Sequence, residues 1–209
     1  MKIGEIKAQA LMLMYPFAQI SFNDSDDEAI NKSVYELKAD PNYRSLLEAS
    51  VGAINRAFSL IEERGLSTQK CVDIGASACQ RVRGKASIEK ERELLRVERV
   101  LLHKDNKTYA PGYEEDEKYI YAPYARGVYT IVYKTKIPRI TSTTRDSYDA
   151  ELPYGLGEIL PYFVASELAV RENGELSKEL KSRFEELVSA KEAKAPHCED
   201  CFQIIYQME

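Results

Sequence analysis

The sequence predicts a mainly helical α+β fold, a bundle of about four helices with a small β domain inserted between the second and third main helices. Apolar residues recur every three or four positions in the first and last thirds of the chain, which is typical of helices that bury one face. The middle is rich in β-branched and aromatic residues interrupted by Gly and Pro, which favours strands. The predicted domains are the bundle, residues 1–66 with 151–195, the β insert, residues 67–150, and a C-terminal arm, residues 196–209.

Two helices are predicted in the first third of the chain. The first covers Ile3–Tyr15, because its apolar residues have helical spacing and Pro16 cannot continue a helix. The second begins at Asp40-Pro41, which offers an N-cap and a proline suited to the first helical position, and ends near Gly65. Its apolar stripe is the strongest helix signal in the chain: Leu47, Val51, Ile54, Phe58 and Ile61.

Strands are predicted in the middle of the chain. The clearest is Val128–Ile137, where aromatic and β-branched residues alternate along the segment. A second strand is expected within Glu93–Leu102 and a third at Tyr119–Tyr121. Turns are expected at Asp105–Lys107 and at Ala122-Pro123, since these residue types favour them.

Helices return after Pro153. One apolar stripe is predicted to lie on a third helix, and after the break at Asn173-Gly174 another stripe is predicted to face the core from a fourth helix. Because neither the first pair of helices nor the last encloses a core by itself, we expect the two pairs to pack together. The two late stripes are Leu156, Leu160, Val164 and Leu168, and Leu176, Leu180, Phe184 and Leu187.

Composition excludes several classes of protein. With 44% apolar and 30% charged residues the chain is expected to fold, and no apolar run is long enough to cross a bilayer. The formal net charge of −5 argues against a dedicated nucleic-acid-binding protein. Four cysteines are too few for a disulfide scaffold, so we expect the chain to fold in a reducing cytoplasm.

The charges cluster locally. Arg81–Lys107 holds nine basic and five acidic residues, and Glu114–Glu117 follows with four acidic residues in a row. Two interpretations stay open: two solvated faces of opposite sign, or a contact between neighbouring copies of the chain.

No signature of an enzyme is present in the sequence. There are only two histidines, and the Gly-x-Ser-x-Gly elbow, the Walker loop and the Gly-x-Gly-x-x-Gly fingerprint are all missing. The sequence therefore predicts no catalytic residues and no cofactor.

The helical stretches resemble the helical core of head-tail adaptor proteins of tailed bacteriophages. The resemblance covers roughly three-fifths of the chain and is carried by KIGEIKAQALMLMY (Lys2–Tyr15), YRSLLEASVGAINRAFSLIEERGL (Tyr43–Leu66) and ELPYGLGEILPYFVASELA (Glu151–Ala169). Several adaptors carry a β domain between the second and third bundle helices, and here the insert matches in position only.

The resemblance implies a structural virion protein without catalysis. Such connectors form a ring, typically of about twelve copies, below the portal, where they extend the DNA channel and receive the tail. The implied partners are the portal protein, a tail or tail-completion protein and copies of the chain itself, while genomic DNA passes through without sequence-specific binding. The implied location is the head-tail interface of the virion, and the host cytoplasm during assembly.

Two groups of residues are candidate contacts. The apolar residues of the arm, Phe202, Ile204, Ile205 and Tyr206, are predicted to dock on another subunit or on the portal, with folding back onto their own bundle as the alternative. Tyrosines of the insert are predicted to contact neighbouring subunits, with coverage of a thin β core as the alternative. These are Tyr113, Tyr119, Tyr121 and Tyr124.

A rival hypothesis comes from the Cys-x-x-Cys of the arm. Cys198 and Cys201, with His197 beside them, could supply two or three ligands to zinc, since thiolate and imidazole suit a tetrahedral ion. This pattern would make the chain a cytoplasmic zinc-binding or regulatory protein. A structural zinc site normally needs a fourth ligand, and no matching second pair is present, so the main prediction includes no metal.

Overall fold

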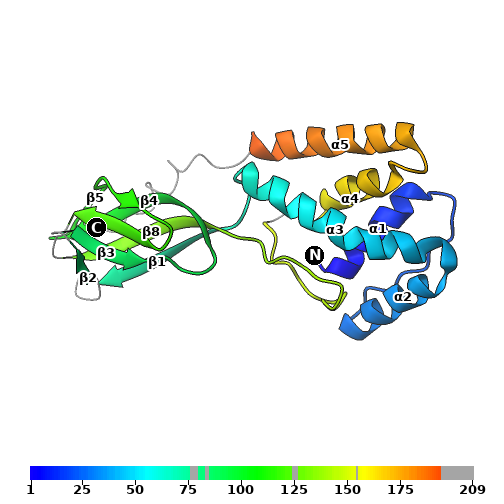
Figure 1. The fold of residues 1–209 in the computed structure, drawn as a ribbon, viewed down its shortest axis with the longest axis horizontal. Helices are drawn as coiled ribbons and strands as arrows, with labels where there is room; N and C mark the ends of the chain where they lie inside the picture. The colour runs from blue at the N-terminus through cyan, green and yellow to red at the C-terminus, as the bar shows by residue number, and fades with distance from the viewer. Residues whose placement is uncertain (76–79, 83–84, 124–126, 154, 194–209) are drawn as a thin grey trace. The chain divides into compact units, whose positions relative to one another are not determined.

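The computed structural model describes residues 1–75, 80–82, 85–123, 127–153 and 155–193 (Figure 1). The chain divides into two compact units. The helical unit consists of Met1–Leu66 together with the described residues between Pro138 and Ala193, and the β unit consists of the described residues of Ser67–Ile137.

The predicted fold class is wrong. The described residues form five helices and eight strands, and the strands make two four-stranded antiparallel sheets, so the chain is not a mainly helical four-helix bundle with a minor insert. The strand content was underestimated because several strands are only two to five residues long, too short for alternation to be visible in the sequence. Their pairing depends on residues that are distant along the chain.

Three helices form the first part of the helical unit: α1 (Ile3–Met14), α2 (Asp27–Ala39) and α3 (Pro41–Glu63). α1 and α3 begin where the sequence predicted, and Asp40 caps α3 by accepting a hydrogen bond from the amide of Asn42 at 2.9 Å. The prediction missed α2, because only four of its residues are buried and one of them is the polar Ser33. α2 is capped by Asp26, which accepts from the amide of Ala29 at 2.8 Å.

Two helices complete this unit: α4 (Leu160–Ala169) and α5 (Gly174–Glu192). α4 packs against α1, α3 and α5, and its buried Ala165, Ser166 and Ala169 keep it thin enough for three neighbours. The predicted break before α5 is confirmed, since Asn173 caps it by accepting from the amide of Leu176 at 3.1 Å.

The β unit consists of two antiparallel sheets. One has the strand order β1-β8-β4-β5 and the other β2-β3-β7-β6. The strands of the first sheet are β1 (Gln69–Gly75), β8 (Val128–Thr135), β4 (Leu94–Lys104) and β5 (Lys107–Tyr109). Those of the second sheet are β2 (Gln80–Val82), β3 (Lys85–Glu89), β7 (Tyr119–Pro123) and β6 (Glu114–Glu115).

One predicted turn of the β unit is confirmed and one is wrong. Asp105 and Asn106 have φ of 53° and 58° and form the turn of the β4–β5 hairpin, a conformation that Asp and Asn tolerate. Ala122 and Pro123 lie in β7 instead, where they pair with Ala86 and Lys85 of β3.

The β unit has its own hydrophobic core. The predicted alternation of β8 is confirmed, because Tyr129, Ile131 and Tyr133 all point into this core. The other sheet contributes Ile88 and Ile120, together with smaller side chains. A core that draws on both sheets makes this unit a domain in its own right.

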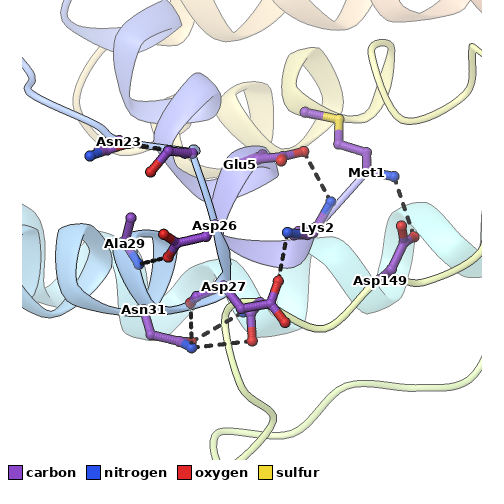
Figure 2. A network of polar contacts seen from close by, with 11 residues as sticks. Met1, Lys2, Glu5, Asn23, Asp26, Asp27, Ala29, Asn31 and Asp149 are labelled. Carbon is purple, nitrogen blue, oxygen red and sulfur yellow. Dashed lines mark hydrogen bonds and ion pairs between the residues drawn. The ribbon is translucent and has the colours of Figure 1, made fainter.

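The segment after the β unit returns the chain to the helices. Residues 138–150 were predicted to be part of the insert, but they cluster with the helical unit. The amide of Ile3 donates to the carbonyl of Tyr148 at 3.0 Å, and the amide of Gly4 to that of Asp146 at 2.7 Å. Figure 2 shows the amino group of Met1 beside Asp149, an ion pair of 3.3 Å. The start of α1 is therefore held by backbone that lies more than a hundred residues later.

A buried ion pair secures residues 138–150, which we call the return segment, to α1. Lys7, whose side chain is 4% exposed, contacts Asp146 at 2.6 Å, and Lys38 of α2 approaches the other carboxylate oxygen at 3.5 Å. Burial lowers the pKa of Lys7, and the charge of Asp146 opposes this shift. Gly4 lets α1 and α2 approach each other closely, since a Cβ there would lie 2.6 Å from a methyl group of Ile30 in α2.

We expect Asp146→Asn to lower the free energy of unfolding by about 3–5 kcal/mol, because it leaves the ammonium of Lys7 buried without a countercharge. Denaturant unfolding followed by circular dichroism measures the change. Glu48→Gln is the control: Glu48 pairs with Arg44 on the surface, and its loss should cost about 0.5 kcal/mol. Equal losses in the two variants would contradict the assigned role of the buried pair.

A second expectation concerns alkaline pH. Burial, together with a hydrogen bond to Glu93, raises the pKa of Tyr133 to about 12. Between the ordinary tyrosine pKa of about 10 and this value, the unfolded chain loses the phenol proton and the folded chain keeps it, so the free energy of unfolding falls as pH rises. In Tyr133→Phe this fall should be shallower in unfolding measured from pH 9.5 to 12, a range set by those two values. Tyr35→Phe, at a tyrosine that is 75% exposed, is the control, and identical slopes in all three proteins would refute the assignment.

Candidate interaction surface

The predicted tyrosine contacts lie on the β unit. Tyr113 is half-buried against the core and donates to the carbonyl of Val97 at 3.4 Å. Tyr119 and Tyr121 are neighbours on the outer face of β7, with ring centroids 6.3 Å apart, and Tyr121 donates to Asp116 at 2.8 Å. Tyr124 lies outside the described residues. Their role in contacts between subunits stays a prediction.

The basic and acidic runs meet within one chain. Lys85 pairs with Glu114 at 2.5 Å, and Lys90 pairs with Glu115 at 2.7 Å. Lys90 also donates to the carbonyl of Asp116. These ion pairs join β3 and the residue after it to β6, so the two runs compensate each other inside the β unit.

The residues of the zinc hypothesis, His197, Cys198 and Cys201, lie outside the described residues. In the part of the chain that the structure does describe, no group of three or more His, Cys, Asp or Glu side chains is arranged to hold a metal. Cys71 is an exposed thiol on β1. His103 has both ring nitrogens in hydrogen bonds of 2.9 Å, to the hydroxyls of Thr108 and Thr130.

The helical unit carries an open groove between α1, α4 and α5, which the sequence did not reveal. Three adjoining hollows of about 570, 260 and 360 Å³ all border Tyr162. Leu13 is shared by the first and second, Glu158 by the second and third, and Arg183 by the first and third. We call this continuous surface the α1–α4–α5 groove.

The groove is lined by apolar and polar side chains together. Leu13 and Tyr162 are half-buried, and Met12 of α1 is 37% exposed. α4 and the turn before it add the buried Pro161 and Ile159.

α5 contributes a second apolar stripe beside its core stripe. The buried residues of α5 are Leu180, Phe184 and Val188, whereas Leu176 and Leu187, which were predicted to face the core, are half-buried and line the groove. The prediction was wrong for these two because helical spacing defines a face only to within one residue on each side.

Charged side chains surround the groove. Glu158, Glu179 and Glu186 are exposed at its rim. Arg183 pairs with Glu186 at 2.7 Å. The ammonium nitrogen of Lys191 lies only 2.2 Å from the position that a Cβ on Gly155 would occupy. The residues that line the groove include neither His nor Cys, and charged side chains stand beside the apolar ones.

Comparison with known proteins does not place the chain in a family. No protein-family model matches it, and a search of curated proteins finds no significant similarity. None of the described helices combines the length and the apolar character that crossing a bilayer requires.

Matched leucines on α5 test whether the groove is dispensable for folding. Leu180→Ala removes a buried side chain and should cost about 2–5 kcal/mol of unfolding free energy. Leu187→Ala removes one that the fold leaves half-exposed, and should cost about 1 kcal/mol. Urea unfolding distinguishes the two. If Leu187→Ala were as costly as Leu180→Ala, the groove would be part of the core and not a binding surface.

Proposed function

We propose that the chain is a structural component of the head-tail joint of a tailed bacteriophage. In this proposal it assembles as a ring of about twelve copies below the portal, extends the DNA channel and receives the tail. It acts without catalysis or cofactor. Its partners are the portal protein, a tail or tail-completion protein and its own copies, in the virion and, before that, in the host cytoplasm.

The observation that carries the proposal is how the three adaptor-like stretches pack. Lys2–Tyr15 contains α1, Tyr43–Leu66 covers most of α3, and Glu151–Ala169 ends with α4. α4 packs against both α1 and α3, although the whole β unit separates it from them in the sequence. The stretches that resemble an adaptor core thus belong to one packed unit, as the resemblance requires.

Three further features support an assembly role. The β unit is inserted between α3 and α4, the position in which several adaptors carry a β domain. In the α1–α4–α5 groove apolar side chains lie beside charged ones, as they do in protein-protein contacts. The negative net charge also suits a channel through which DNA slides without sticking.

Association with a portal ring tests the proposal. The purified chain, alone and mixed with a portal ring of the same phage, is compared by light scattering for mass and by electron microscopy for shape. A complex of about twelve copies per portal ring is expected from the closed symmetry of connectors. The proposal would be overturned if the chain formed no complex with the portal ring and metal analysis found stoichiometric zinc. That result would favour a zinc-binding protein that uses Cys198 and Cys201.

The arm is expected to be needed for assembly but not for the fold. Deleting residues 196–209 should leave the circular dichroism spectrum unchanged and abolish association with the portal ring, because the apolar side chains of the arm are lost. Within the full chain, Phe202→Ser with Ile205→Ser should have the same effect, whereas Gln203→Ser with Gln207→Ser should retain association. Unfolding of the truncated chain, or assembly without the apolar residues, would refute this role.

A further inference from the structure

The strand β1 (Gln69–Gly75) lies at the border of its sheet. The strand order of this sheet is β1-β8-β4-β5, so β8 is the only described strand that pairs with β1. We propose that β1 of a second copy pairs with the outer edge of this strand. The two strands run antiparallel, a two-fold axis passes between the two Cys71 residues, and the two sheets become one.

The hydrogen bonds of the sheet show which backbone groups of β1 point outward. The amide of Thr135 donates to the carbonyl of Thr68 at 2.9 Å, and this pair continues the register of β1 and β8 by one residue. In an antiparallel ladder hydrogen-bonded and non-hydrogen-bonded pairs alternate, so the even-numbered residues of β1 bond to β8 and the odd-numbered ones face away. Gln69, Cys71 and Asp73 therefore direct their amides and carbonyls to the outer edge.

The side chains along this edge are accessible. Gln69, Lys70, Cys71 and Asp73 are exposed, and in a strand these four point to both faces of the sheet. A border strand whose outward amides and carbonyls lack a neighbouring strand is a template for a further strand. The occupant of this edge must therefore supply a strand of matching polarity.

A second β1 has that polarity when Cys71 of one copy stands opposite Cys71 of the other. Gln69 of each copy then faces Asp73 of the other, so the three outward residues of both strands form hydrogen-bonded pairs. On the other face Lys70 stands opposite Val72. No two like charges are directly opposite each other in this register, which favours pairing.

Other two-fold registers fit less well. An axis at Lys70 or at Asp73 would place two like charges directly opposite each other, which destabilises a sheet. An axis at Val72 would bring the two Asp73 carboxylates to diagonal positions, where they repel each other. With the axis at Cys71 the diagonal pair is formed by the two Lys70 side chains, and each of these is already neutralised by Glu93 of its own chain at 3.0 Å.

The pairing does not rest on the proposed function. A two-fold contact is closed after two copies, whereas a ring needs a head-to-tail contact. The pairing therefore belongs to the isolated chain before any ring is formed.

Oxidative linking in the full chain tests the pairing. After Cys79→Ser, Cys198→Ser and Cys201→Ser, Cys71 is the only thiol of the chain. In the proposed register the two Cys71 Cα atoms lie about 5.5 Å apart, a separation that a disulfide spans. The control adds Cys71→Ser and Lys70→Cys, which gives an exposed thiol whose partner is diagonal, about 7–8 Å away. Relative to alkylation of each thiol by a small reagent, the link at 71 should form at least about tenfold faster than the link at 70.

A proline variant tests the pairing without a disulfide. Cys71→Pro removes an amide that points outward, so the ladder between β1 and β8 and the circular dichroism spectrum should be retained. Sedimentation at increasing concentration should show loss of the dimer in Cys71→Pro and its retention in Cys71→Ser.

Three results would overturn the proposal: equal normalised linking rates at positions 70 and 71, a yield of linked dimer that does not rise with protein concentration, or equal dimer formation by Cys71→Pro and Cys71→Ser. Should Cys71→Pro fail to fold, the linking rates decide alone. No portal is used, so failure here is distinguishable from failure of the proposed function.

Discussion

The buried pair of Lys7 and Asp146 is the interaction on which the helical unit depends most. It joins α1 to a segment that follows the whole β unit along the chain, and Lys38 brings α2 to the same carboxylate. A buried ammonium is costly unless it is paired, so this contact tolerates little displacement. After this ion pair the chain continues through Asp149 to α4, the helix that contacts α1, α3 and α5. Closing the helical unit therefore requires the return segment to be in place.

The β unit, in contrast, satisfies its requirements internally. Its two sheets enclose a core of their own, and Tyr129, which is fully buried, donates its hydroxyl to the carbonyl of Pro123. Lys85 and Lys90 neutralise part of the acidic run that follows. Charges that suggested a contact between copies are thus partly used within one chain. The pair Tyr119 and Tyr121 lies on the outer face of this unit.

α5 has one apolar face in the core of the helical unit and two further leucines that stay half-exposed. Phe184 packs against Phe163 of α4, with ring centroids 5.1 Å apart, and secures the helix to the unit. Leu176 and Leu187 lie to one side of this contact and stay half-exposed. When the apolar face of a helix is wider than the neighbouring helices can cover, part of that face stays exposed to solvent. The groove follows from this excess of apolar residues on α5.

The sequence by itself determined the local elements with strong signals: the start of α3 at Asp40-Pro41, the start of α5 after Asn173, the turn at Asp105-Asn106 and the alternation of β8. Each is set by residues that are neighbours along the chain, so a single sequence shows them. Only the tertiary structure decided three features: the pairing of the short strands, the packing of residues 138–150 with the helical unit, and the exposure of Leu176 and Leu187. These depend on which distant surfaces meet, because burial and pairing are properties of the assembled fold and not of the local pattern.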